Sequence, residues 1–134
     1  MTDDQTCARA GTPPVLVVDD DPDARWLLAA LLAEEGYAVS EASNADDALR
    51  CLEKQPDIQA VLTDIQMPGS IDGFELAMRL TRESPEIAVL LISGREHPAA
   101  NALPSGVKFL LKPWAPAEML DQLKMLLSWQ RGAA

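Results

Sequence analysis

The stretch Val15-Leu16-Val17-Val18-Asp19-Asp20-Asp21-Pro22 decides the fold. Its first four residues form a short aliphatic run, rich in β-branched side chains, that is typical of a strand buried on both faces of a parallel sheet. Three acids end this run, and Asp21 followed by Pro22 predicts the N-cap and first turn of a helix. The chain therefore opens with a buried strand, an acidic loop and a helix, and Gly36 is expected to stop that helix.

The same alternation of strand and helix continues along the chain. Asn44 and Asp72 are expected to cap the second and third helices, and the last helix begins near Pro116. Strands that alternate with helices imply a parallel sheet covered by helices on both faces. Besides the first, strands are expected at residues 37–42, 58–63, 87–92 and 107–111.

The segment 95–106 breaks the pattern, because Pro98, Pro104 and Gly106 leave room for only one or two helical turns. We therefore predict an α/β fold, a doubly wound five-stranded parallel sheet with a shortened or missing fourth helix. In the first helix, Trp26 and Leu27 follow helical spacing, and Trp26 is expected to pack against the protein.

Length and charge restrict the class of protein. The 134 residues fit one domain, predicted at 14–130 after a flexible tail at 1–13. No apolar run approaches the ~20 residues that span a bilayer, and we expect no secretory signal, because residues 1–14 contain no apolar stretch. The net charge of -10 argues against direct contact with nucleic acid or anionic membrane. Two isolated cysteines fit a reduced, cytoplasmic protein.

Polar side chains stand at the ends of four expected strands. Asp19 and Asp20 follow the first strand, Asp64 the third, Ser93 the fourth and Lys112 the fifth. The C-terminal ends of parallel strands face the same way, and ligands bind at that edge of an open sheet. We therefore expect three carboxylates, one hydroxyl and one ammonium group to converge.

The chemistry of this cluster predicts its ligand. Two carboxylates about 4 Å apart repel by roughly 4 kcal/mol at an effective dielectric near 20, so the acids favour a bound cation. Oxygen ligands of this kind match Mg²⁺, which favours phosphate as a co-ligand. With Lys112 opposite, such a metal would neutralise a phosphoryl group passing to Asp64. Ser93 could then donate a hydrogen bond to a phosphoryl oxygen, so we predict that Asp64 is a phosphoacceptor.

Over about Val15 to Leu127, the sequence resembles the receiver domain of two-component response regulators, in the stand-alone, CheY-like form. The motifs that carry the resemblance are Val17-Val18-Asp19-Asp20-Asp21, Leu62-Thr63-Asp64-Ile65-Gln66-Met67-Pro68, Asp72-Gly73, Ile92-Ser93-Gly94 and Leu111-Lys112-Pro113. The resemblance implies a flavodoxin-like sheet of strand order 2-1-3-4-5.

It also implies roles for individual residues. Asp64 would be the phosphoacceptor, Ser93 the switch hydroxyl and Lys112 the phosphoryl-binding residue, with a cis Lys112–Pro113 bond. Phe109 stands where many receivers have a switching Tyr, and it keeps the ring without the hydroxyl. The resemblance further implies that the Mg²⁺ ligands are Asp19, Asp20, Asp64 and the backbone carbonyl of Gln66.

The implied function is a phosphorelay switch. The donor would be the phosphohistidine of a histidine kinase or histidine phosphotransfer protein, and phosphorylation would alter a face that meets an unknown downstream protein. The chain would catalyse only its own phosphorylation and dephosphorylation. Two alternatives within the family stay open: a receiver cut from a hybrid histidine kinase, and a phosphate sink without output. A homodimer also stays open.

Three other classes fit less well. A calcium loop starting at Asp19 would need Gly and Glu where Ala24 and Ala30 stand. A phosphatase with an aspartyl nucleophile draws slight support from Asp19 and Asp21, but the chain lacks an obvious cap insertion. A flavin-binding domain would need a phosphate loop after the first strand, where the acids would repel phosphate.

Overall fold

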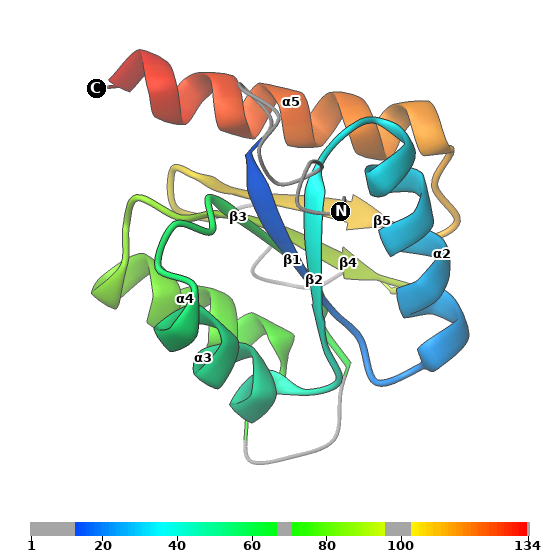
Figure 1. Cartoon of the computed structure of the whole chain (residues 1–134), viewed down its shortest axis with the longest axis horizontal. Helices are drawn as coiled ribbons and strands as arrows, with labels where there is room; N and C mark the ends of the chain where they lie inside the picture. Colours follow the sequence, from blue (N-terminus) through cyan, green and yellow to red (C-terminus); the bar gives the residue numbers. More distant parts are fainter. Residues whose placement is uncertain (1–12, 67–70, 96–102, 134) are drawn as a thin grey trace, which may run out of the picture.

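The computed structural model describes residues 13–66, 71–95 and 103–133, so nearly all of the predicted tail lies outside the described residues. The described chain forms three layers, with the sheet between two pairs of helices (Figure 1). The strands are β1 (Pro14–Val18), β2 (Ala38–Ala42), β3 (Ala60–Asp64), β4 (Ala88–Ser93) and β5 (Val107–Leu111), and the helices are α2 (Pro22–Glu34), α3 (Ala45–Lys54), α4 (Gly73–Glu83) and α5 (Pro116–Ala133).

The sheet has the predicted order, β2-β1-β3-β4-β5, and every neighbouring pair is parallel. Val18 lies level with both Ala42 and Thr63, and Ser93 lies level with Leu111. Because no strand is shifted, the C-terminal ends of β1, β3, β4 and β5 meet at one edge. The order and register therefore bring the polar strand ends together.

Each face of the sheet has its own apolar core. On β1, Leu16 and Val18 pack with α3 and α4, whereas Val15 and Val17 pack with α2 and α5. All four side chains are fully buried, and each such burial contributes about 1.5–3 kcal/mol. Two cores explain why the strands are almost continuously apolar rather than alternating.

The predicted helix caps are present. Asp21 accepts a hydrogen bond from the backbone of Asp23, and Asn44 accepts one from Asp47. Such caps typically contribute about 1 kcal/mol each, since they satisfy free N–H groups at the helix start. Gly36 ends α2 at φ 98°, a left-handed conformation that few other residues adopt without strain.

The packed face of α2 differs from the expectation. Leu28, Ala29 and Leu32 are buried, whereas Trp26 is 67% exposed and Leu27 is 48% exposed. The prediction that Trp26 packs against the protein is therefore wrong. The physical reason is that α2 is apolar around most of its circumference, so spacing alone does not select the buried face.

The connection from β4 to β5 contains no helix within its described residues, 94–95 and 103–106. Residues 96–102, which include Pro98, lie outside the described residues. The described chain thus has four helices, in agreement with the shortened or missing fourth helix of the prediction. None of the described helices has the length and apolar content needed to cross a membrane.

Candidate functional site

Three carboxylates and an ammonium group gather at the C-terminal edge of the sheet. One carboxylate oxygen from each of Asp19, Asp20 and Asp64 lies within 4.8 Å of the others. The Lys112 Nζ lies 3.6 Å from Asp64 Oδ1. These are the four charged residues predicted to converge, and the sheet delivers them from β1, β3 and β5. Asp64 itself is the last paired residue of β3 rather than the residue after it.

Burial sets the electrostatics of this cluster. Asp19 is only 3% exposed, and loss of hydration raises the pKa of its carboxyl above the usual range. Burial likewise raises the pKa of Asp64, and the neighbouring Asp19 and Asp20 add to the rise while Lys112 opposes it. Buried acids that repel one another are stabilised by a cation. The single positive charge of Lys112 therefore does not balance the three carboxylates.

The Asp19 segment is held on three sides. Its backbone N–H donates to Ala42 on β2 at 3.1 Å, and its Oδ1 accepts from the Asp21 N–H at 2.9 Å. The Arg25 Nη1 donates to the Asp19 carbonyl at 2.7 Å, and the Arg25 Nε lies 3.1 Å from Glu41 Oε1. Sequence reasoning missed Arg25. The available signal was a cation four residues after the Asp21 cap, one helical turn from the acids.

Ser93, the predicted switch hydroxyl, is buried at the end of β4. Its Oγ accepts a hydrogen bond from the Arg95 N–H at 3.1 Å, which leaves the hydroxyl hydrogen for another acceptor. The Lys112 N–H donates to the Ser93 carbonyl at 2.7 Å, so these two residues are fixed to each other through the backbone. The Lys112–Pro113 peptide is cis, as the resemblance implies.

Gly73 at the start of α4 lies against the backbone of Asp64. A Cβ at Gly73 would lie 2.0 Å from the Asp64 carbonyl oxygen, which no side chain tolerates. The Gly73 N–H donates to the Ile65 carbonyl at 2.9 Å, and Thr63 Oγ1 donates to the Asp64 carbonyl at 3.1 Å. The N-terminus of α4 thus rests directly on the end of β3.

The remaining predicted residues have defined positions. Gln66 is exposed, two residues after β3, and its predicted carbonyl ligand role stays a prediction. Phe109 lies on β5, is half-buried and packs against the core on the α3 and α4 side. Its role as a switch aromatic also stays a prediction.

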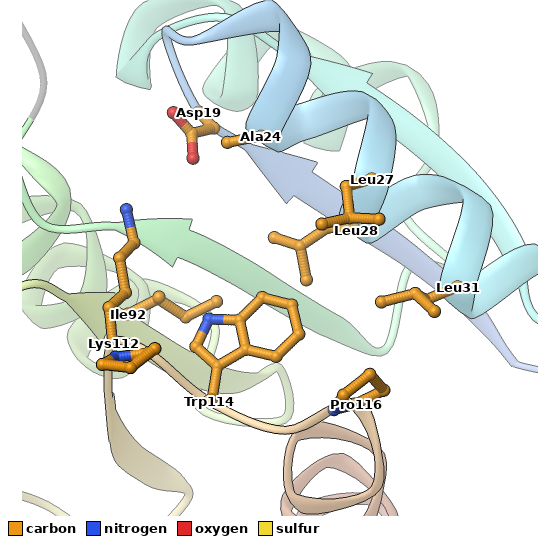
Figure 2. Close-up of a pocket in the computed structure, with 10 residues that line it drawn as sticks. Asp19, Ala24, Leu27, Leu28, Leu31, Ile92, Lys112, Trp114 and Pro116 are labelled. Atoms are coloured by element: carbon orange, nitrogen blue, oxygen red, sulfur yellow. The ribbon is translucent and has the colours of Figure 1, made fainter.

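An apolar groove opens beside the charged cluster, between α2 and the segment that joins β5 to α5. Figure 2 shows the Trp114 ring facing Leu28 and Leu31 of α2 across this groove, with Asp19 and Lys112 at one end. Its volume is about 460 Å³, within the usual range for ligand sites. The groove and the charged cluster therefore share two residues.

The donor set fits a divalent cation. All three side chains offer carboxylate oxygens, and their close spacing allows one ion to contact them together. The donors are hard oxygens without histidine or cysteine, which argues against zinc and for Mg²⁺ or Ca²⁺.

Comparison with known proteins identifies the family. A family model for the response regulator receiver domain matches residues 15–124, and the chain therefore belongs to this family. The transcriptional regulatory protein AruR of Pseudomonas aeruginosa is 42% identical over 132 residues, which cover 92% of this chain and 53% of AruR. The positive alginate biosynthesis regulatory protein of the same organism is 40% identical, over 82% of this chain and 45% of that protein. The chain spans about half the length of these curated relatives.

Solved structures agree on the fold. A CheY-like receiver domain protein from Methanospirillum hungatei superposes with a TM-score of 0.82 at 25% identity, covering 92% of this chain and 100% of that one. The response regulator TrrA of Thermotoga maritima, solved in complex with Mg(2+)-BeF, gives a TM-score of 0.76 at 31% identity, covering 86% and 99%.

Proposed function

We propose that this chain is a phosphorylation switch in which Asp64 accepts a phosphoryl group from a phosphohistidine. The observation that carries the proposal is the position of the Asp64 carboxylate, which lies close to the Asp19 and Asp20 carboxylates and 3.6 Å from the Lys112 ammonium. The three carboxylates can hold a cation together, and Lys112 supplies a second positive charge next to Asp64. A transferred phosphoryl group would therefore meet positive charge from the metal and from Lys112.

In the transfer step, an oxygen of Asp64 attacks phosphorus as the bond from phosphorus to the donor imidazole breaks. The imidazole leaves with the electron pair and takes a proton from solvent. Lys112 exchanges its contact with the carboxylate for one with a phosphoryl oxygen, and Ser93 donates its hydroxyl hydrogen to another. Mg²⁺, held by Asp19, Asp20, Asp64 and the backbone carbonyl of Gln66, would supply further neutralisation of phosphoryl charge. Water later attacks phosphorus, the bond from phosphorus to the Asp64 oxygen breaks, and inorganic phosphate leaves as the free carboxylate is restored.

The conformational change would begin at Ser93 and extend to β5. When Ser93 turns toward the phosphoryl group, it leaves the Arg95 N–H, and the adjacent strand repacks around Phe109. Phe109 is half-buried, so it has both a packed state and space to move. Such a shift between two packings would change the surface over β5 and α5, where a downstream protein would bind.

The phosphodonor is proposed to be a histidine kinase or histidine phosphotransfer protein in the cytoplasm. The groove supports docking of a protein, because it is lined by Leu27 and Leu31 and reaches Asp19 and Lys112 of the charged cluster. Both side chains are apolar, and Leu27 and its neighbour Trp26 are largely exposed. Acidic residues flank this helix at both ends, so a partner with an apolar stripe and basic margins would be complementary.

The chain is proposed to act only on itself, not as an enzyme for other substrates. A hybrid kinase receiver and a phosphate sink remain the alternatives. The matched part covers only about half of each curated relative, so an output domain outside this sequence is compatible with the proposal. A phosphatase with Asp19 as nucleophile is disfavoured, because Asp19 is buried and already accepts a hydrogen bond from Asp21. Homodimer formation is a further proposal that sedimentation with and without phosphorylation would test.

The test is intact mass after incubation with acetyl phosphate, with and without Mg²⁺. We expect one added phosphoryl group, which requires Mg²⁺ and is absent from Asp64→Ala. Asp46→Ala, which removes an exposed acid from α3, is the matched control and should behave as the wild type. Phosphorylation of the Asp64→Ala variant, or phosphorylation of the wild type in the absence of Mg²⁺, would contradict the mechanism.

A further inference from the structure

Arg25 connects the acidic loop to the neighbouring strand. Its side chain leaves α2, is 21% exposed, and contacts two groups from different elements. One nitrogen donates to the Asp19 carbonyl at 2.7 Å, and another lies 3.1 Å from Glu41 on β2. The guanidinium suits this task, because its donors point in fixed directions within one plane. A surface ion pair alone would contribute little, so the contact with the carbonyl is the informative one.

The carbonyl that Arg25 holds belongs to the peptide between Asp19 and Asp20. Rotation of that peptide plane would change the direction in which both carboxylates leave the backbone. The Asp19 side is already fixed, by a backbone bond to Ala42 and a side-chain bond from Asp21. Asp20 is exposed, so Arg25 is the described contact that fixes the far side of this peptide.

A cation site makes this orientation consequential. Mg²⁺ demands nearly ideal octahedral geometry, whereas Ca²⁺ accepts flexible arrangements with variable ligand numbers. Groups that orient metal ligands typically change metal affinity by 10–100-fold when they are removed. We infer that Arg25, braced by Glu41, is a positioning residue that orients Asp19 and Asp20 for Mg²⁺. This inference rests on the proposed function.

The opposite expectation follows from charge alone. Arg25 is a cation close to the acid cluster, so its removal should strengthen the binding of any divalent ion if it acted only through its charge. Positioning predicts weaker binding instead. The sign of the change in affinity therefore separates the two explanations, and Arg25→Lys tests the geometry at constant charge.

The experiment is isothermal titration of the metal-free protein with Mg²⁺ and, separately, with Ca²⁺. We expect Arg25→Ala to weaken Mg²⁺ binding about 10-fold or more and Ca²⁺ binding clearly less, so the ratio of the two affinities falls. Arg25→Lys, whose ammonium cannot hold both partners in the same fork, should also weaken Mg²⁺ binding. Arg79→Ala is the matched control, since it removes an arginine paired with Glu83 on α4. We expect it to leave both affinities close to the wild-type values.

The outcomes are distinguishable. Unchanged or tighter Mg²⁺ binding by Arg25→Ala would overturn the positioning role and leave the proposed function standing. Failure of the wild type itself to bind Mg²⁺ would overturn both. If Arg25→Ala does not fold, Arg25→Lys decides the question, because wild-type Mg²⁺ affinity in that variant contradicts the inference.

Discussion

Asp64 is the residue on which the site depends, and its ionisation opposes folding in the absence of metal. Burial, aided by Asp19 and Asp20, raises its pKa above the ordinary value of 3.8. A carboxyl with a raised pKa in the folded state binds protons more tightly there than in the unfolded chain. Stability therefore falls as the pH rises from the ordinary value through the raised pKa of Asp64, and the loss is complete once the pH lies above that raised pKa.

Asp64→Asn should consequently stabilise the metal-free protein at pH 7, by on the order of 1 kcal/mol. The gain should shrink toward pH 4 and vanish below it, where the wild-type carboxyl is already protonated. Urea unfolding in EDTA at several pH values measures this. Asp57→Asn, which removes an exposed acid at a turn outside the site, is the control, and an equal gain in that variant would mean that the effect is not specific to Asp64. A mutant that is less stable than the wild type at pH 7 would contradict the picture of repelling acids.

Gly73 is the second residue that single substitutions can test. A methyl group there would lie 2.0 Å from the Asp64 carbonyl oxygen, so either α4 or the end of β3 must move. We expect Gly73→Ala to lower the free energy of unfolding by about 1–3 kcal/mol and to slow phosphorylation by acetyl phosphate.

Gly94→Ala is a close control for this prediction. Gly94 directly follows Ser93 of the site, but an added Cβ there meets no atom within 4 Å. Equal effects of the two substitutions in urea unfolding would show that the contact with Asp64 is unimportant.

At the scale of elements, α2 is where the structure adds most to the sequence. Its outer face exposes Leu27 at 48%, beside the groove and the charged cluster. Leu27→Glu should slow phosphotransfer from a phosphorylated histidine kinase about 10-fold or more, because it places a charge where the partner's apolar side chains would pack. The rate with acetyl phosphate should not change.

Met125→Glu is the matched control, since Met125 is 54% exposed on α5 and does not line that groove. Phosphotransfer rates for both variants, with both donors, form the measurement. A loss of reactivity toward acetyl phosphate in Leu27→Glu would place the defect in the site rather than in docking.

The elements differ in how far the sequence predicts them. Runs of β-branched residues, three side-chain caps and Gly36 predict the strands and helix starts, because each acts through neighbours along the chain. Convergence of Asp19, Asp64 and Lys112 also follows, since parallel strands share one edge. The buried face of α2 does not follow, because nearly every face of that helix is apolar. The contact between Arg25 and Glu41 depends on the spacing of α2 from β2, which no local pattern encodes.

At the scale of the whole molecule, the acids at the site add to a net charge of -10. A ligand that binds only the folded state stabilises it by mass action, about 1.4 kcal/mol at ten times its dissociation constant. Mg²⁺ should therefore raise the melting temperature of the wild type by a few degrees. Asp64→Asn should lose most of this shift, since it removes one of the three carboxylates.

Scanning calorimetry with MgCl₂, compared with NaCl at equal ionic strength, separates binding from general screening of charge. A shift of the same size in NaCl, or in Asp64→Asn with MgCl₂, would mean that the site does not hold the ion.

The parallel register that aligns the strand ends has a further consequence. The site draws its groups from β1, β3, β4 and β5, and a cut in the exposed turn at residues 55–57 would separate Asp19 and Asp20 from Asp64, Ser93 and Lys112. Neither fragment holds more than part of the set. The proposed phosphoacceptor activity would return only when the two fragments pair along β1 and β3, where Val18 meets Thr63. The chemistry of this receiver domain is thus suited to a split reporter, in which covalent labelling records the reassembly of two polypeptides.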